Sequence, residues 1–261
     1  MSKHHRIWNQ SIHEKYLREG RGCGSGIAYS PWVQVQDFAS RGVVSRVKGR
    51  TTGRIHHLMS NNELAYFYIL DWSDSVTDIR EQYPLSDLEC AVKCAATAGI
   101  RYPKDNVSGY PYVLTCDFMI TSASGLKART VKQSAELNNP RVLEKLEIER
   151  RYWFSRGIDW KIVTENEISR QKAKNIEWLY TAIDFSVSGC SEIEIEQAKI
   201  YMLDSLRCGE NSAIEVVQMV EDEFMLASGA GLQLFKQLVL DGRYALDISQ
   251  PLDLTEKAVA A

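Results

Sequence analysis

The chain has 261 residues, of which 44% are hydrophobic and 25% charged, and its formal net charge is −3. This composition is typical of globular proteins, and the length suffices for one large or two modest domains. No stretch approaches the roughly 18 apolar residues of a membrane helix, which excludes a membrane span, and residues 1–15 lack the apolar segment of a secretory signal. We expect a soluble cytoplasmic protein.

The six cysteines include no CxxC pair and no zinc-finger spacing with histidine, so we expect reduced thiols and neither zinc nor disulfides. The charges are divided along the chain. Residues 1–56 carry ten Lys/Arg against three Asp/Glu, whereas residues 169–261 carry eight against fifteen. A basic segment suits a phosphate backbone, which would repel an acidic one, so the two ends are expected to bind different partners.

The first 56 residues are rich in Gly and Arg and show no sustained helical or strand period. We expect a basic N-terminal arm with short strands, and the apolar side chains of Tyr29, Trp32, Val33 and Val35 indicate that part of it packs on the domain that follows. The alternative is a flexible terminus that only keeps the protein soluble.

Residues 57–168 alternate helix and strand patterns. Ser60-Asn-Asn-Glu63 fits a capping box and is followed by an apolar helix face, so Glu63 opens a helix. The later pattern predicts strands over 76–85, 112–122, 127–134 and 159–165, and helices over 86–99, 139–157 and 168–183. This order predicts an α/β fold with a restriction-endonuclease-like mixed sheet flanked by helices.

After Gly189 the pattern becomes helical. Helices are expected over 191–206, from 212, and over 225–240, followed by a strand over 243–248. Three helices and a short terminal hairpin are typical of a winged-helix module, although a plain helical bundle fits almost as well. We therefore expect three parts: the arm at 1–56, a main domain at 57–168, and a small, mainly helical, winged-helix-like domain at 169–261.

Asp117 lies in an apolar strand, where a buried carboxylate is costly unless it is paired, hydrogen-bonded or bound to a metal. Lys132 follows 15 positions later, and a hairpin can bring the two side by side. With Glu63 arriving from a helix start, two carboxylates and one ammonium can converge. The pattern alone leaves two alternatives open: Glu63 only caps its helix, and Asp117 with Lys132 only forms a cross-strand ion pair.

The same spacing resembles the PD-(D/E)xK nuclease core, in which a strand Asp and a nearby carboxylate hold magnesium and a Lys lies beside the attacking water. Hard oxygen ligands suit Mg²⁺, which polarises the phosphoryl oxygen and lowers the pKa of water, while a cation offsets the developing charge. D-x(14)-K is a weak signal by itself because chance supplies it often.

Longer segments resemble the TnsA family of transposon-encoded endonucleases, from about Lys15 to Tyr180. They are Glu19-Gly-Arg-Gly with Pro31-Trp32 and Val35-Gln36, Thr52-Gly-Arg-Ile-His-His-Leu58, Asp78-Ile-Arg-Glu-Gln-Tyr-Pro-Leu85, Leu143-Glu-Lys-Leu-Glu-Ile-Glu-Arg-Arg-Tyr-Trp153 and Asn175-Ile-Glu-Trp-Leu-Tyr180. The family's catalytic Glu, Asp and Lys fall on Glu63, Asp117 and Lys132.

The resemblance implies a magnesium-dependent endonuclease that cuts the 5′ strands of double-stranded transposon ends. A TnsB-type transposase would cut the 3′ ends, and the acidic C-terminal domain would dock on a TnsC-type ATPase. One or two Mg²⁺ ions, replaceable by Mn²⁺, would be held by Glu63, Asp117, Thr130 and the Val131 carbonyl, with Glu149 in support. The side chains expected to contact DNA are Arg18, Arg21, Arg46, Lys48, Arg50, Arg54, His56 and His57.

Thr130 departs from the family pattern, which often has Gln or Glu there. A neutral hydroxyl is a weaker ligand, so we predict looser Mg²⁺ binding than in a Gln-bearing relative. The alternative for Glu149 is a solvated helix charge, and for His56 and His57 a packed or surface pair. A catalytically weak architectural subunit that bridges transposase and regulator is the alternative function. A winged-helix transcription factor fits less well, because the acidic C-terminal region lacks a basic recognition helix.

Overall fold

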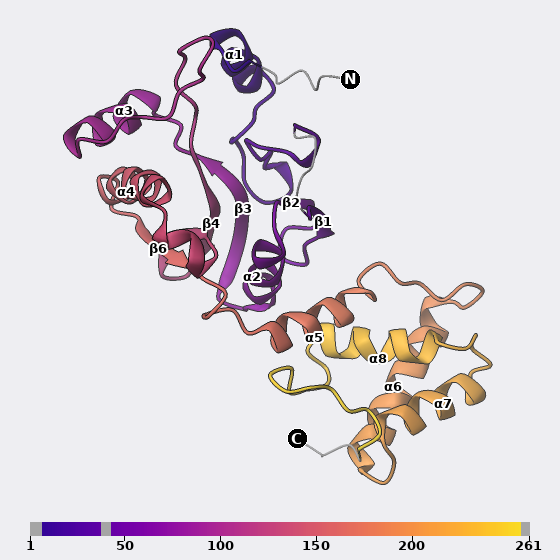
Figure 1. Cartoon of the computed structure of the whole chain (residues 1–261). Coiled ribbons are helices and arrows are strands. Elements are labelled where there is room, and N and C mark those ends of the chain that lie inside the picture. Colours follow the sequence, from indigo (N-terminus) through magenta and orange to yellow (C-terminus); the bar gives the residue numbers. More distant parts are fainter. Residues whose placement is uncertain (1–6, 38–42, 257–261) are drawn as a thin grey trace, which may run out of the picture. The chain divides into compact units, whose positions relative to one another are not determined.

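The computed structural model describes residues 7–37 and 43–256, and the chain divides into two compact units, residues 1–168 and 169–261 (Figure 1). Parts of the expected arm, residues 1–6 and 38–42, and the end of the C-terminal region, residues 257–261, lie outside the described residues. No helix in the described part of the chain is long and apolar enough to span a membrane.

A four-stranded mixed sheet is the centre of the first unit, in the order β3-β4-β5-β6. The strands β3 (Val76–Pro84), β4 (Thr115–Ser122) and β5 (Gly125–Val131) are antiparallel neighbours, and β6 (Asp159–Val163) runs parallel to β5. A parallel neighbour requires a crossover connection, which here includes helix α4 (Pro140–Phe154). The predicted mixed α/β sheet is confirmed.

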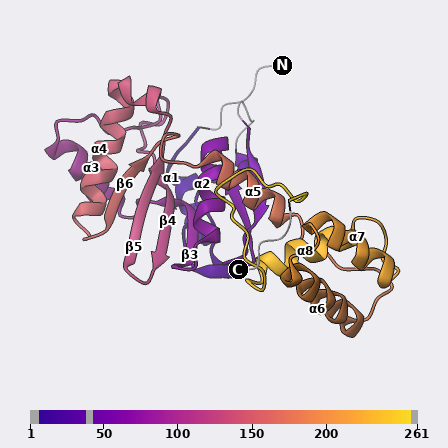
Figure 2. The same cartoon turned by 90° about the horizontal axis from the view of Figure 1, so that it is seen from below.

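Helices pack on both sides of this sheet (Figures 1 and 2). On one side, α3 (Leu88–Thr97) and α4 bury a cluster against the strands. Its fully buried members are Leu85, Ala91, Cys116, Met119, Ala128, Tyr152 and Trp153. On the other side α2 (Asn61–Trp72) lies beside β3, and the ring of Tyr66 contacts that of Phe118 on β4. The start of α3 differs from the prediction by one position, because Asp87 and not Ser86 caps it.

The N-terminal region contains a helix that the sequence pattern did not predict, α1 (Gln10–Arg18), capped by the side chain of Asn9. Tyr16 is its one buried residue, and the Tyr16 ring packs edge-on against Trp8 and Trp32. Because only one residue of this helix is buried, its sequence has no repeating apolar pattern from which a helix could be predicted. The expected short strands are present as the antiparallel pair β1 (Ser45–Lys48) and β2 (Ile55–Leu58). Short 3₁₀ helices occur at η1 (Gly26–Ala28), η2 (Val35–Asp37) and η3 (Ser134–Asn138).

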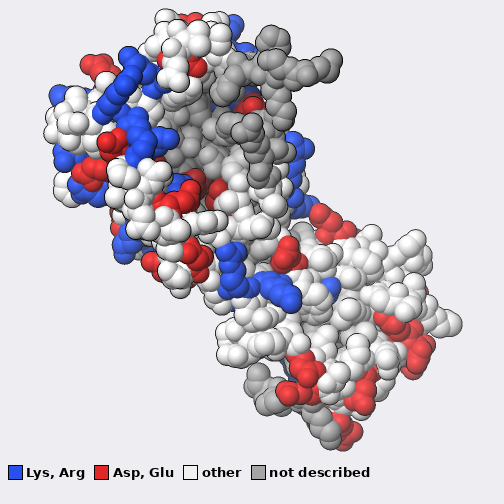
Figure 3. Space-filling view, viewed as in Figure 1, with Lys and Arg blue, Asp and Glu red and all other residues white. Residues whose placement is uncertain are grey.

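The second unit is helical, as predicted, with α5 (Arg170–Tyr180), α6 (Glu192–Cys208), α7 (Ala213–Glu223) and α8 (Ala230–Leu240). Both α6 and α7 begin with the expected capping boxes. The core of the unit includes Met202, Leu206, Val216, Val220, Leu234, Phe235 and Leu238. On the face shown in Figure 3, the acidic side chains of this unit are spread over its surface.

The strand expected over 243–248 is wrong, since no strand occurs in the described residues of the second unit. The backbone there is held by a side chain instead: the Asn175 amide Nδ2 donates to the carbonyls of Ile248, at 3.0 Å, and Gln250, at 2.6 Å. A carbonyl satisfied in this way needs no neighbouring strand. The terminal hairpin of a winged helix is therefore not formed, and the unit is a helical bundle with an irregular C-terminal segment.

Candidate active site

Asp117 and Lys132 are brought together by the β4–β5 hairpin. The Val131 amide donates to Asp117 Oδ2 at 2.7 Å, and Lys132 Nζ lies 3.4 Å from the same oxygen. Lys132 follows the last residue of β5, but its amide still donates to the Val163 carbonyl at 3.0 Å, which continues the pairing with β6. Its backbone is thus fixed by the sheet while its side chain reaches back, Nζ also donating to the Val131 carbonyl at 2.9 Å.

Glu63 is the third residue of α2, and its carboxylate lies at the helix start. Its amide donates to Ser60 Oγ at 3.1 Å, its Oε1 accepts from Ser60 Oγ at 2.9 Å, and its Oε2 accepts from the Met59 amide at 3.0 Å. A regular capping box would use the Ser60 amide instead. Oε2 also accepts from the side-chain amide of Gln82 on β3, at 3.3 Å.

Burial and the neighbouring charges shift the pKa values of Glu63 and Lys132. Burial raises the pKa of the Glu63 carboxyl to about 7, and the negative charge of Asp117 adds to this effect. Burial acts to lower the pKa of the Lys132 ammonium, but the carboxylates of Asp117, Glu149 and Glu63 more than offset it and raise the pKa. The site therefore combines a permanent cation with closely placed carboxylates.

Glu149 lies in the same charge cluster. It is only 6% exposed, so the alternative of a solvated helix charge is wrong. Burial and, to a lesser extent, the negative charge of Asp117 raise its pKa to about 7, against the opposing hydrogen bond from Thr130. The Thr130 hydroxyl donates to Glu149 Oε2 at 2.6 Å and accepts from Trp160 Nε1 at 3.3 Å. Thr130 therefore directs its proton at Glu149.

The donor set can be compared with the needs of a divalent cation. No group of three or more His, Cys, Asp and Glu side chains spaced to hold a metal occurs in residues 7–37 and 43–256. Glu63 and Asp117 are nonetheless two buried carboxylates in mutual repulsion, which a cation between them would relieve. Two carboxylates with water in the remaining positions are a common way to bind Mg²⁺, so the residues fit that ion.

A depression of about 400 Å³ opens beside this cluster. It is lined by Met59, Ser60, Asn61 and Asn62 at the start of α2, by Val131, Lys132, Gln133 and Glu136 after β5, and by Val43. The N-terminus of a helix carries a partial positive charge, which favours anions. The N-terminus of α2 and the side chain of Lys132 therefore line the same depression.

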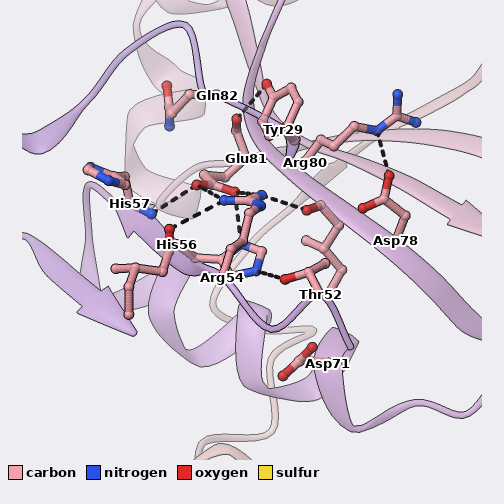
Figure 4. Close-up of polar contacts among 12 residues, drawn as sticks. Tyr29, Thr52, Arg54, His56, His57, Asp71, Asp78, Arg80, Glu81 and Gln82 are labelled. Carbon is pink, nitrogen blue, oxygen red and sulfur yellow. Dashed lines mark hydrogen bonds and ion pairs between the residues drawn. The ribbon is translucent and has the colours of Figure 1, made fainter. Parts of the chain in front are cut away.

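Three of the side chains expected to contact DNA are instead buried and used inside the protein. Arg21 Nη1 lies 2.5 Å from Asp37 Oδ2 and donates to the Trp32 carbonyl at 3.2 Å. Arg54 and His56 both bind Glu81 (Figure 4). The expectation that these three contact DNA is wrong, because each is at most 9% exposed.

The other expected DNA contacts lie nearer the surface. Arg18, Arg46 and Arg50 are exposed and Lys48 is half-buried. His57 is half-buried and its Nδ1 accepts from the Val35 amide at 3.1 Å. Burial lowers the pKa of its imidazole.

Sequence reasoning missed Glu81 and Gln82. Glu81 is fully buried in β3, and Gln82 next to it is 5% exposed. The signal that identified Asp117, a charge inside a strand that alternates with buried apolar residues, also applies to Glu81 beside Ile79. Nothing in the residue types around Gln82 indicates its contact with Glu63.

The raised pKa values make the stability of the metal-free protein depend on pH. Glu63 and Glu149 keep protons up to about pH 7 when folded, whereas their ordinary value is 4.5. The folded state therefore binds more protons between these values, so the free energy of unfolding should fall as the pH rises from 4.5 to 7. Thermal unfolding in metal-free buffer between about pH 5 and pH 8 measures this. The Glu63→Gln variant should show a shallower decline, and an identical slope would contradict the assignment.

Comparisons with known proteins show which family the chain resembles. The family model described as "TnsA-like endonuclease N terminal" matches residues 73–165, and "TnsA endonuclease C terminal" matches residues 167–248. The chain is also 37% identical over 229 residues to "Transposon Tn7 transposition protein TnsA" from Escherichia coli, covering 87% of this chain and 82% of that protein. Asp117, Lys132 and Glu149 fall inside the first family match, and Glu63 precedes it.

Proposed function

The chain belongs to the TnsA family of endonucleases, and from that membership we propose that it hydrolyses the 5′ strands of transposon ends in a magnesium-dependent reaction. The observation that carries the proposal is the convergence of Asp117, Lys132 and the Glu63 carboxylate beside one open depression. This set of groups suits phosphodiester hydrolysis, because charge accumulates on the phosphorus oxygens while water attacks.

Each side chain has a distinct role in the proposal. Glu63, Asp117 and the Val131 carbonyl would hold Mg²⁺ or Mn²⁺, which when bound polarises the phosphoryl oxygen and lowers the pKa of water. Lys132 keeps its proton, since its pKa is raised. Its ammonium would orient the attacking water and offset negative charge on the phosphate.

Thr130 has a revised role in this proposal. Its hydroxyl proton points to Glu149, so we assign it to holding that carboxyl and not to the metal itself. Glu149 in turn lies in the electrostatic field of Asp117 and Lys132 and supports the site from α4. The looser Mg²⁺ binding expected for a threonine at this position stays a prediction.

DNA would approach along the surface that carries Arg46, Lys48 and Arg50, which belong to β1 and the turn after it. The scissile phosphate would enter the depression between Lys132 and the start of α2. Arg18 on α1 and the half-buried His57 are further candidates for backbone contacts.

The partners are those that membership of the TnsA family implies, and the charge of the second unit agrees with one of them. Residues 169–261 carry fifteen Asp/Glu against eight Lys/Arg, which disfavours contact with DNA and suits a protein surface. We assign this unit to docking on a TnsC-type ATPase regulator, and we assign cleavage of the 3′ strands to a TnsB-type transposase.

A plasmid that carries both transposon ends tests the proposal. Incubated with this protein, a TnsB-type transposase and Mg²⁺, it should be nicked on the 5′ strands, which primer extension maps to the nucleotide. Omitting Mg²⁺ should abolish the nicks and Mn²⁺ should restore them. An architectural subunit would instead leave the 5′ strands intact while still being required for cleavage of the 3′ strands by the transposase.

A further inference from the structure

Gln82 has a backbone conformation that strands do not normally contain. Its φ is +49°, although it lies in the interior of β3. In the β3–β4 register it falls between the pairs Glu81–Phe118 and Tyr83–Cys116, and therefore opposite Asp117. A side chain other than glycine is strained at positive φ, and such positions persist where the surroundings enforce them, often at functional sites.

The side chain of Gln82 connects Glu63 to the sheet. Its Nε2 donates to Glu63 Oε2 at 3.3 Å, and its Oε1 accepts from Thr115 Oγ1 on β4 at 3.2 Å. The other donors to the Glu63 carboxylate, the Met59 amide and Ser60 Oγ, belong to the segment that starts α2. Gln82 therefore fixes the Glu63 carboxylate relative to the strand that carries Asp117.

The backbone around Gln82 is held from several directions. The Trp32 amide donates to the Gln82 carbonyl at 3.3 Å, and Tyr29 OH donates to the Glu81 carbonyl at 3.0 Å. The Glu81 carboxylate is bound by Arg54 and by His56, whereas the Gln82 side chain points away from that cluster (Figure 4). The N-terminal region and β2 thus hold the strained conformation in place.

We propose that Gln82 is a positioning residue, whose carboxamide holds the Glu63 carboxylate where it can bind a divalent cation together with Asp117. This inference rests on the proposed function, because it takes Glu63 and Asp117 as the metal ligands. In this proposal Gln82 acts through its contact with Glu63. Outer partners of metal ligands typically contribute about ten- to a hundredfold in metal affinity.

Two substitutions of Gln82 distinguish the effect of its contact with Glu63 from the effect of its strained backbone conformation. Gln82→Met keeps the chain length but removes the amide, and Gln82→Asn tolerates positive φ better but is too short to reach Glu63. Calorimetric titration of the full-length variants with Mn²⁺ should show the Kd raised about ten- to a hundredfold in both. The two substitutions should change the melting temperature of the metal-free protein by different amounts. If Gln82 had only a structural role, the variant with the lower melting temperature would also have the higher Kd, and the two Kd values would differ.

Two matched substitutions on β4 test the same proposal with a smaller change to the protein. Thr115→Val removes the hydroxyl that donates to the side-chain oxygen Oε1 of Gln82 and should raise the Mn²⁺ Kd by about threefold to tenfold, a weaker effect of the same kind. Thr121→Val makes the same chemical change where the hydroxyl meets Arg80, and should leave the Kd unchanged. If the Gln82 variants fail to fold, this pair decides alone, and equal Kd values overturn the proposal.

The Asp117→Asn variant distinguishes this inference from the proposed function. Loss of Mn²⁺ binding in Asp117→Asn, with Gln82→Met and Gln82→Asn within about twofold of the wild type, would overturn only the role of Gln82. Wild-type binding in Asp117→Asn would overturn the metal site itself, and both proposals with it.

Discussion

Replacing Asp117 by Asn is expected to lower the rate of 5′-strand cleavage by about three orders of magnitude or more, since a ligand and a charge at the reacting centre are lost together. The carboxylate of Asp117 accepts the Val131 amide at 2.7 Å and lies 3.4 Å from the Lys132 ammonium. An asparagine oxygen can still accept from Val131, so the hairpin should remain folded. The rate of nicking of the end-bearing plasmid, with the transposase present, is the measurement.

Asp159→Asn is the matched control for Asp117→Asn. Asp159 also stands in a strand of the sheet and also pairs with a cation, Arg129, at 2.6 Å, but its side chain is 48% exposed. Its replacement should leave the cleavage rate within about threefold, because Asp159 is half exposed and Arg129 keeps the Ala128 and Asp159 backbone carbonyls as acceptors. Comparable cleavage by Asp117→Asn and Asp159→Asn would refute Asp117 as a catalytic residue.

The fold and part of the site follow from local sequence patterns. Asp117 lies in β4, and Lys132 directly follows β5. The two strands are recognisable in the sequence because β4 is rich in β-branched and aromatic residues and is joined to β5 by a turn that ends in Gly125, whose φ is +102°. The 15-residue separation then brings the aspartate and lysine together, since a hairpin pairs residues at fixed distances. Capping boxes likewise predicted the starts of α6 and α7 from the serines and glutamates alone.

What the sequence did not predict depends on contacts between distant segments. Arg54 lies in a basic stretch that suits DNA, yet it folds onto Glu81, 27 positions away. Gln82 reaches Glu63 across 19 positions, through a backbone conformation that no residue type requires. Basic composition describes the charge of a segment, but only packing decides which of its cations remain on the surface.

Removing one member of the Glu81 cluster is expected to destabilise the first unit strongly. Arg54 donates through two nitrogens to the Glu81 carboxylate, His56 Nδ1 lies 2.8 Å from it, and the His57 amide donates at 3.0 Å. All of these contacts are buried from solvent or nearly so (Figure 4). Removing one partner of a buried pair costs about 3–5 kcal/mol, because the other charge is left without compensation.

Glu81→Gln should therefore lower the melting temperature by about 10 °C. The double variant Arg54→Met/Glu81→Gln should lose less stability than the sum of the single changes, since neither charge remains unpaired. Chemical denaturation of the four proteins in this cycle gives the coupling energy. Additive losses would show that the pair does not act as a unit.

The pH dependence of this effect has a definite sign. Burial acts to raise the pKa of Glu81, but hydrogen bonds from Arg54 and His56 outweigh it and hold the pKa at about 2, below the ordinary 4.5. The stabilisation is therefore present above pH 4.5 and is lost as the pH falls towards 2. Glu147 on α4 has the same low pKa through Arg150 and Arg151, but its side chain is 31% exposed. Solvent screens that pair, so Glu147→Gln should cost less than about 1 kcal/mol at any pH, and a loss as large as that of Glu81→Gln would show that burial is not the cause.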